Sequence, residues 1–163
     1  MFDIVCFSET KLDDSIPNSF YKNDFYFKLR LDRSRHGGGL TIQSKSNKLN
    51  FVYSYRAPNL KEQLFLDKLD DFIHTLNLND PLFIVGDFNM NFDLNNINSN
   101  VREFSCNNNL VNFVQKPTRV AKKFFKKTNS YKCSSTLIDL FLNNGDLIDQ
   151  TDVIDCPFSD NTD

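Results

Sequence analysis

Three short apolar runs stand out in the pattern of hydrophobic and polar positions, the first two of them uninterrupted. They cover residues 4–7, 82–85 and 137–141. An uninterrupted apolar run of this length is typical of a strand that is covered on both faces. The third run carries an acid, Asp139, in its middle, where an unpaired buried carboxylate would be costly. The pattern therefore predicts three buried strands, one of them with an unusual charge.

Weaker patterns predict further strands and one long loop. Residues 40–42 follow three glycines, and residues 51–55 alternate aromatic with smaller or polar side chains, as a half-buried strand does. Residues 110–114 favour an extended conformation, and residues 153–154 predict a last short strand. The stretch from 10 to 36 predicts a loop.

A first helix is predicted after the break at Pro58. Asn59 in the N-cap position and Glu62 three residues later form a capping box. The apolar residues that follow fall on one face at helical spacing: Phe65, Leu69, Phe72, Ile73 and Leu76. His74 lies on this helix, and we expect it to be a surface or capping residue and not a ligand.

A second, short helix is predicted where Asn100 and Glu103 repeat the capping-box spacing. Strands then outnumber helices along the chain and alternate with them. This order predicts an α/β fold, a sandwich built on sheets whose loops carry polar residues at the strand ends.

Composition limits the functions that are open to the chain. Its 163 residues, 40% hydrophobic and 25% charged, fit one globular domain. Nineteen basic and 21 acidic residues give a net charge of −2, which excludes a generally basic nucleic-acid coat. No apolar run approaches the ~18 residues of a membrane span, and the first residues do not resemble a signal peptide. We therefore expect no membrane partner.

The cysteines and histidines limit the metal chemistry. The four cysteines lie far apart and include no C-x-x-C pair, which argues against a zinc knuckle. A disulfide framework is not expected in a chain without a secretory signal. The four are Cys6, Cys106, Cys133 and Cys156. We expect reduced thiols in an intracellular compartment, with nucleus and cytoplasm both open. Two histidines cannot make a His-rich site, so a bound metal would be hard and oxygen-ligated.

Acidic residues stand at the ends of apolar runs or inside them. Glu9 and Asp87 follow two of the runs, Asp139 lies within the third, and Asp160 is near the C-terminus. Any one of them could be a solvated loop residue. Several carboxylates that converge at one sheet edge repel each other, and a divalent cation relieves that repulsion best.

Five short motifs occur in an order that resembles a known superfamily. They are S-E-T at 8–10, Y-R-A-P-N at 55–59, V-G-D-F-N at 85–89, L-I-D at 137–139 and S-D at 159–160. The chain resembles the endonuclease/exonuclease/phosphatase superfamily, and most the endonuclease of non-LTR (LINE-type) retrotransposons. The resemblance implies a four-layer α/β sandwich, with two packed β-sheets flanked by helices. It also implies a single domain that is truncated at both ends and lacks terminal strands.

The resemblance further implies hydrolysis of a phosphodiester or phosphomonoester with Mg²⁺ or Mn²⁺ as cofactor. Glu9 and Asp160 would be the metal ligands. A hard cation at this position would neutralise charge on the scissile phosphate. DNA would be the substrate, and the parent element would supply a reverse transcriptase domain as partner.

Four residues match the catalytic positions of the family. By resemblance, Asp87 aligns or deprotonates the attacking water, Asn89 holds a phosphate oxygen, and Tyr55 contacts the phosphate or its developing charge. Asp139 matches the acid that orients the closing histidine of the family. Donors aimed at the developing charge are what this chemistry requires.

The sequence departs from the family pattern at two places. The resemblance implies an upstream strand that bears an active-site asparagine, which we expect this chain to lack. Asn161 stands where the family has a histidine. Asparagine can donate a hydrogen bond but cannot carry a proton or a positive charge. The leading interpretation is therefore a retroelement nuclease whose parent reaction nicks DNA. Its alternative is a catalytically impaired or dead remnant that at most binds nucleic acid.

A third reading keeps the fold and changes the substrate to a small phosphate ester or a lipid headgroup. The Y-R-A-P-N motif, which the chain shares with retroelement nucleases, argues against it. The glycines at 37–39 predict a turn and not a phosphate loop, because no Lys-Ser or Lys-Thr follows them.

Residues 116–132 carry seven basic side chains and no acid. Such a run can be a solvated loop. It can also clamp a DNA backbone, with Phe124 or Phe125 against a base or sugar. The second reading assigns nucleic-acid contacts to five residues: Arg119, Lys122, Lys123, Lys126 and Lys127.

Overall fold

A computed structural model describes residues 4–8, 15–17, 27–31, 40–44, 50–76, 81–92, 99–125, 129–145 and 147–154. The chain forms two compact units, Met1–Leu49 and Asn50–Asp163. Sheets and helices are both present, so the chain is of the mixed α/β type that the pattern predicts.

The first unit contains a three-stranded antiparallel sheet in the order β1-β3-β2. The strands are β1 (Ile4–Ser8), β2 (Phe27–Leu31) and β3 (Leu40–Ser44). The strands at 4–7 and 40–42 are confirmed. β2 lies inside the stretch predicted as a loop, so that prediction was wrong there. Its sequence F-K-L-R-L alternates with period two, a strand signal that the polar and aromatic residues before it obscured.

The second unit is built on a four-stranded sheet in the order β4-β5-β9-β6. The strands are β4 (Asn50–Tyr55), β5 (Leu82–Asp87), β6 (Val111–Asn112) and β9 (Asp139–Asn143). β4 and β5 run parallel, whereas β9 is antiparallel to both of its neighbours. The predicted strands at 51–55, 82–85, 110–114 and 137–141 are confirmed with different bounds, but residues 153–154 form no strand.

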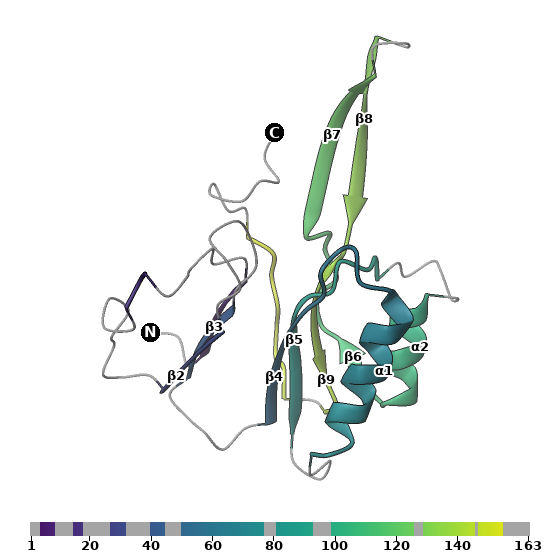
Figure 1. Cartoon of the computed structure of the whole chain (residues 1–163). Helices are drawn as coiled ribbons and strands as arrows, with labels where there is room; N and C mark the ends of the chain where they lie inside the picture. The colour runs from purple at the N-terminus through teal and green to yellow at the C-terminus, as the bar shows by residue number, and fades with distance from the viewer. Residues whose placement is uncertain are drawn as a thin grey trace. The chain divides into compact units, whose positions relative to one another are not determined.

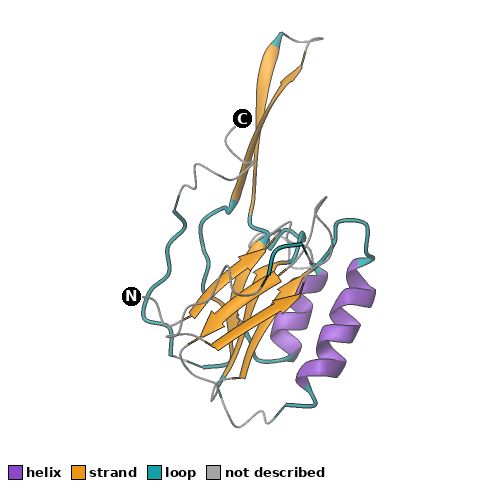
Figure 2. Ribbon diagram, turned by 60° about the vertical axis from the view of Figure 1, so that its left-hand side comes forward, coloured by secondary structure: helices purple, strands orange, loops and turns teal. Residues whose placement is uncertain are grey.

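Helices α1 (Glu62–Ile73) and α2 (Asn100–Asn107) lie side by side on one face of this sheet (Figures 1 and 2). The hydrophobic core lies between the helices and that face. It includes Leu66, Leu69 and Ile73 of α1, Val101 and Phe104 of α2, and Ile84, Leu140 and Leu142 of the sheet. Phe88, which is fully buried, meets the ring of Phe65 edge-on at 5.5 Å between centroids.

The start of α1 and one part of its buried face differ from the prediction. Lys61 is the N-cap, not Asn59, because the Leu60 N–H donates to the Ala57 carbonyl at 2.9 Å and keeps the preceding turn outside the helix. Phe72 is 49% exposed and does not belong to the core. His74 is exposed at the C-cap, as predicted, and α2 has Ser99 as its N-cap instead of Asn100.

The basic stretch is not a loop. β7 (Arg119–Phe125) and β8 (Ser130–Thr136) pair antiparallel as a two-stranded hairpin. The hairpin extends beyond the end of the four-stranded sheet (Figures 1 and 2). A charged run with alternating side chains can form a ribbon with two exposed faces, a possibility that a count of charges does not reveal.

Gly86 of β5 pairs with Ser54 of β4 and leaves no room for a side chain. Its φ is +153°, and a Cβ placed on it would lie 1.7 Å from the Ser54 carbonyl oxygen. Only glycine fits such a position. The glycine of the G-D-F-N motif is therefore required by the packing of two strands.

Gly86→Ala is expected to destabilise the fold by about 3 kcal/mol or more, because it adds backbone strain to a clash with main-chain atoms. Urea unfolding measures the loss. Gly145→Ala is the matched control, since a Cβ there would lie at an ordinary 3.6 Å from the Asn143 side chain. Equal stability of the two variants would contradict the close approach.

Candidate active site

Three of the four predicted catalytic residues lie in one row across three neighbouring strands. Tyr55 of β4 is in register with Asp87 of β5, and Asp87 is in register with Asp139 of β9. Side chains of directly paired residues project from the same face of a sheet, with Cα atoms about 4.5–5.5 Å apart across an antiparallel pair. Segments far apart in sequence thus place two carboxylates and a phenol together at one end of the sheet.

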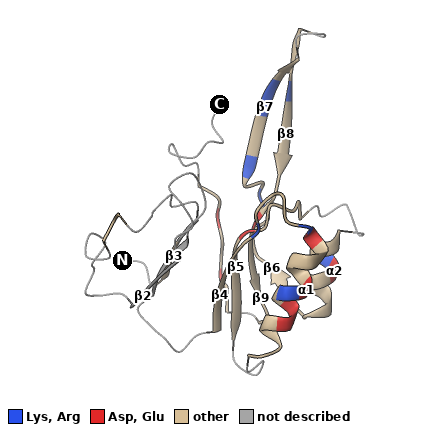
Figure 3. Cartoon of the chain, viewed as in Figure 1, with Lys and Arg blue, Asp and Glu red and all other residues tan. Residues whose placement is uncertain are grey.

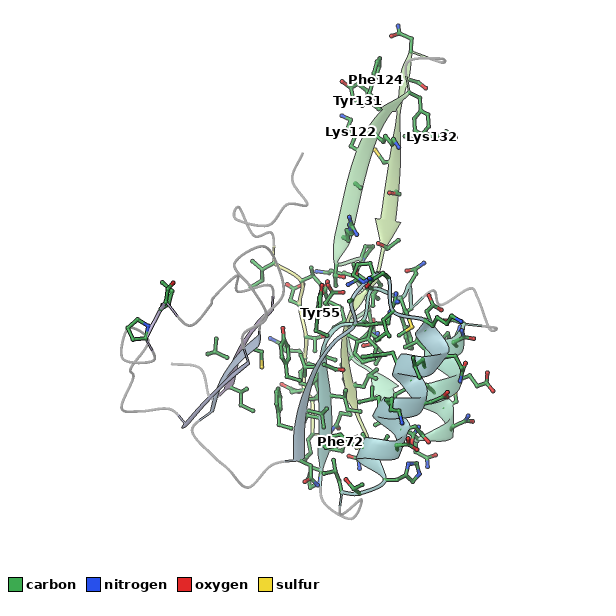
Figure 4. All side chains as sticks on the ribbon, viewed as in Figure 1. Tyr55, Phe72, Lys122, Phe124, Tyr131 and Lys132 are labelled. Carbon is green, nitrogen blue, oxygen red and sulfur yellow. The ribbon has the colours of Figure 1, made fainter. Side chains whose placement is uncertain are left out.

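This row lies on the sheet face that the helices do not cover. Along β5 the burial alternates strictly, with Leu82, Ile84 and Gly86 buried and the residues between them half-buried. Asp87 belongs to the half-buried set and Asp139 begins β9 in the same way. Figure 4 shows Tyr55 at the end of β4 that lies nearest to the hairpin. The row is therefore partly accessible, as a site for a ligand must be.

Asn89, the fourth predicted catalytic residue, is bonded directly to Asp87. Its backbone N–H donates to Asp87 Oδ1 at 2.8 Å, and its side-chain Nδ2 donates to Asp87 Oδ2 at 3.0 Å. The second Nδ2 hydrogen reaches the Arg56 carbonyl at 2.9 Å. Asn89 adopts this arrangement with a left-handed φ of 49°. Both carboxylate oxygens of Asp87 are thereby held in a fixed orientation.

Asp139 is held by a residue that the sequence motifs do not include. The N–H groups of Ile138 and Asp139 both donate to Thr118 Oγ1 at 3.1 Å. Burial raises the pKa of the Asp139 carboxyl, while the Thr118 hydrogen bond and the positive charge of Arg119 partly oppose this shift. Thr118 precedes β7, so the base of the hairpin is hydrogen-bonded to Asp139 in the row of Tyr55, Asp87 and Asp139, which we call the acidic row.

Asp139→Asn is expected to change how stability depends on pH. Because burial raises the pKa of Asp139 above the value of about 3.9 for an unfolded chain, wild-type stability should fall as pH rises between the two values. The neutral asparagine avoids this loss. The stability advantage of the variant should therefore grow across that window and then stay constant. Urea titrations over a pH series measure the stability difference between variant and wild type. Parallel pH profiles of the two proteins would contradict a raised pKa at Asp139.

The hairpin carries the predicted nucleic-acid contacts that the structure describes. Arg119, Lys122 and Lys123 lie on β7 with exposed side chains, and lysine and arginine mark this strand in Figure 3. Lys126 and Lys127 lie outside the described residues. Lys132 of β8 pairs with Lys123 across the ladder and was not among the predicted contacts, although its position in the basic stretch could have pointed to it.

Aromatic rings are interleaved with these cations (Figure 4). Lys122 Nζ lies 4.5 Å from the centre of the Tyr131 ring, and Lys132 Nζ lies 5.2 Å from that of Phe125. Phe124 and Tyr131 pair across the strands with ring centroids 5.0 Å apart. All of these side chains are exposed on a hairpin that has no core of its own.

The proposed metal ligands Glu9 and Asp160 lie outside the described residues, as does Asn161. Within the described ranges, no group of three or more His, Cys, Asp or Glu residues is placed to hold a metal ion. Cys6, Cys106 and Cys133 are free thiols, and burial raises the pKa of Cys6 to about 11. No helix in the described part of the chain is both long and apolar enough for a membrane span.

Comparison with known proteins identifies the class. The solved structure of an AP endonuclease from Archaeoglobus fulgidus is similar to this chain, with a TM-score of 0.56 and 14% identity over 87% of this chain and 76% of that one. The endonuclease domain of TRAS1, a telomere-specific non-LTR retrotransposon, matches with a TM-score of 0.47 and 9% identity over 87% and 67%. No curated protein sequence matches.

The fold is thus an α/β sandwich, which confirms the predicted fold class. The predicted relation to retroelement endonucleases is confirmed by a family model. Residues 49–160 match the family model described as endonuclease-reverse transcriptase. The chain belongs to the endonuclease-reverse transcriptase family. Its extent as one domain over residues 1–163 and its truncation at both ends stay predictions.

Proposed function

We propose that the chain is a metal-dependent nuclease that nicks DNA to expose a 3′ hydroxyl for a reverse transcriptase of its parent element. The observation that carries the proposal is the row of Tyr55, Asp87 and Asp139 across three strands, with Asn89 bonded to Asp87. Family membership supports a nuclease of retroelement origin. The row supplies acid, base and hydrogen-bonding groups at one partly accessible edge.

In this proposal Asp87 accepts a proton from the attacking water. Water adds to phosphorus as it gives this proton to Asp87, the P–O3′ bond breaks, and the leaving O3′ takes a proton from solvent. The products are a 3′ hydroxyl and a 5′ phosphate. Asn89 fixes both Asp87 oxygens, so the base is oriented before substrate binds. A carboxylate can accept more than two hydrogen bonds, which leaves it able to hold a water molecule. A contact from Asn89 to phosphate would require one of its present bonds to be exchanged.

Tyr55 and Asp139 complete the row in different ways. The Tyr55 hydroxyl would donate to a phosphate oxygen as charge develops there. Asp139 would orient the side chain at position 161, which is Asn161 here and a histidine in the family. Thr118 fixes the backbone N–H of Asp139 and so keeps its position on β9.

The donor set of the site suits Mg²⁺ or Mn²⁺. Two carboxylates face each other in register across β5 and β9, an arrangement of like charges that a divalent cation relieves. We propose Glu9 and Asp160 as the ligands, both hard oxygen donors. When bound, the metal would supply positive charge at the scissile phosphate.

The alternative is an impaired nuclease that retains DNA binding. It is favoured by Asn161, which stands where the family has a histidine. Loss of one donor to a developing oxyanion slows catalysis by roughly 10²–10³. Faster nicking by an Asn161→His variant would assign a deficit to this position.

The proposed function is tested by the metal response of the whole chain. Mn²⁺ is expected to raise the melting temperature, because a ligand that binds only the folded state stabilises it. Mg²⁺ or Mn²⁺ is also expected to support nicking of supercoiled plasmid, because the metal supplies positive charge at the phosphate. Glu9→Gln should remove most of both effects. Equal stabilisation of wild type and variant would overturn the metal site, and nicking that persists in excess chelator would overturn the metal dependence.

A further inference from the structure

Arg56 is a buried cation beside the acidic row. Arg56 is only 4% exposed, and it follows Tyr55 directly at the end of β4. Its Nε donates to the Phe88 carbonyl at 2.7 Å and its Nη2 donates to the Asn89 carbonyl at 2.6 Å. Nη1 donates to the Leu60 carbonyl, with longer contacts to Ala57 and Pro58 at 3.4 and 3.5 Å.

These acceptors are main-chain carbonyl oxygens from two separate loops. Residues 57–60 lead into α1, and residues 88–89 follow β5. Burial of a charged group is costly unless its hydrogen-bonding capacity is used, and charge-assisted bonds are the strong ones. A guanidinium has five N–H donors in a rigid plane, so it can bind several fixed carbonyls at once. Arg56 therefore ties the two loops together.

The backbone of Arg56 also forms hydrogen bonds with the segment at the end of β5. Its N–H donates to the Asp87 carbonyl at 3.0 Å, and its carbonyl accepts from Asn89 Nδ2 at 2.9 Å. Main chain and side chain thus hold Asp87, Phe88 and Asn89 from one side. The left-handed φ of Asn89 is sparsely populated, and such conformations persist only where surrounding contacts enforce them.

We propose that Arg56 is the positioning residue of the nuclease site, one that acts through Asn89 to orient the Asp87 carboxylate. The guanidinium fixes the Asn89 carbonyl, and this fixes the conformation that directs both Asn89 donors to Asp87. A lysine ammonium keeps the charge, but its three donors start from one atom and cannot span the same carbonyls. The inference rests on the proposed function, because it assigns Asp87 the catalytic task.

The first test is steady-state nicking by Arg56→Lys. We expect kcat to fall by about 10²-fold, the loss that a small misplacement of a reacting group produces, with KM changed far less. Asn143→Ala is the matched control, because Asn143 is also fully buried and donates to a main-chain carbonyl, that of Leu82, at the other end of the sheet. It should lose stability without a loss of kcat per folded molecule. An unchanged kcat in Arg56→Lys would overturn the proposal.

The second test needs no activity. In ¹⁵N-labelled protein, the Asn89 side-chain amide hydrogens should exchange slowly with solvent, and Arg56→Lys should accelerate that exchange at least about tenfold, the equivalent of removing one hydrogen bond. Asn143→Ala should leave it unchanged. If the wild type does not nick DNA, the proposed function fails while this exchange still decides the role of Arg56.

Arg56→Gln serves if the lysine variant does not fold, since it keeps a planar amide with two N–H donors and buries no charge. It should show the same faster exchange. A measurement on the wild type remains if neither variant folds: the Arg56 Nε–H and the Asn89 amide should both be protected. Rapid exchange at either group in the folded wild type would overturn the proposal.

Discussion

Asp87→Asn is expected to slow nicking of supercoiled plasmid by about 10³-fold, within the range that a positioned general base contributes. The substitution keeps the shape of the side chain and removes its ability to take a proton from water. It also puts an amide where Asn89 donates to both carboxylate oxygens, so one of those two contacts becomes a repulsion between donors. Loss of the base and loss of orientation act on the same step.

Single-turnover nicking with Mg²⁺ in excess is the measurement, because it isolates the chemical step from product release. Asp71→Asn on α1 is the control, since Asp71 has the same side chain but is exposed and paired only loosely with Lys68 at 3.4 Å. Unfolding midpoints of both variants show whether the fold survives. Retention of more than a tenth of wild-type activity by Asp87→Asn would remove Asp87 from its proposed role.

The sequence could predict the strands that carry the site, but not which strands pair with one another. Continuous apolar runs mark β1, β5 and β9 because such short runs favour buried strands. Register is a different matter. The alignment of Asp87 with Tyr55 on one side and Asp139 on the other depends on pairing between segments tens of residues apart, which no local pattern contains.

The contacts that hold the site were also beyond a local reading. Arg56 meets carbonyls 32 and 33 residues away, and Thr118 meets backbone groups 20 and 21 residues away. The Y-R-A-P-N motif drew attention to Arg56 without giving it a task. Side chain to main chain bonds leave no pattern of residue types in sequence, because every non-proline residue offers the same carbonyl and N–H groups.

The hairpin gives the basic stretch a defined geometry, against which its two interpretations, a solvated segment and a DNA clamp, can be weighed. Strand pairing puts Lys123 opposite Lys132 on one face, and Lys122 on the other face beside Tyr131. Like charges directly opposite each other destabilise a ladder. An isolated hairpin is already marginal in stability, so this pairing costs stability that a polyanion would restore. That cost favours the DNA-clamp interpretation over a merely solvated segment.

Removal of charge from the hairpin is therefore expected to weaken DNA binding in a salt-dependent way. In a Lys123→Gln, Lys132→Gln double variant, the slope of log affinity against log salt should fall by about 2, close to one unit for each phosphate that a lysine no longer neutralises. The cation–π contact of Lys132 with Phe125 at 5.2 Å does not prevent the lysine from binding phosphate, because at an exposed site such a contact contributes only about 0.5–1 kcal/mol.

Fluorescence anisotropy with a duplex of arbitrary sequence, titrated over a salt series, measures this slope. The matched control is a Lys61→Gln, Lys68→Gln double variant, which changes the net charge equally on α1 and its N-cap, on the helical side of the sheet. Because long-range attraction depends on net charge whereas counterion release depends on direct contact with phosphate, the control should shift affinity slightly and leave the slope unchanged. Equal slopes for wild type and the hairpin variant would mean that these lysines do not contact phosphate.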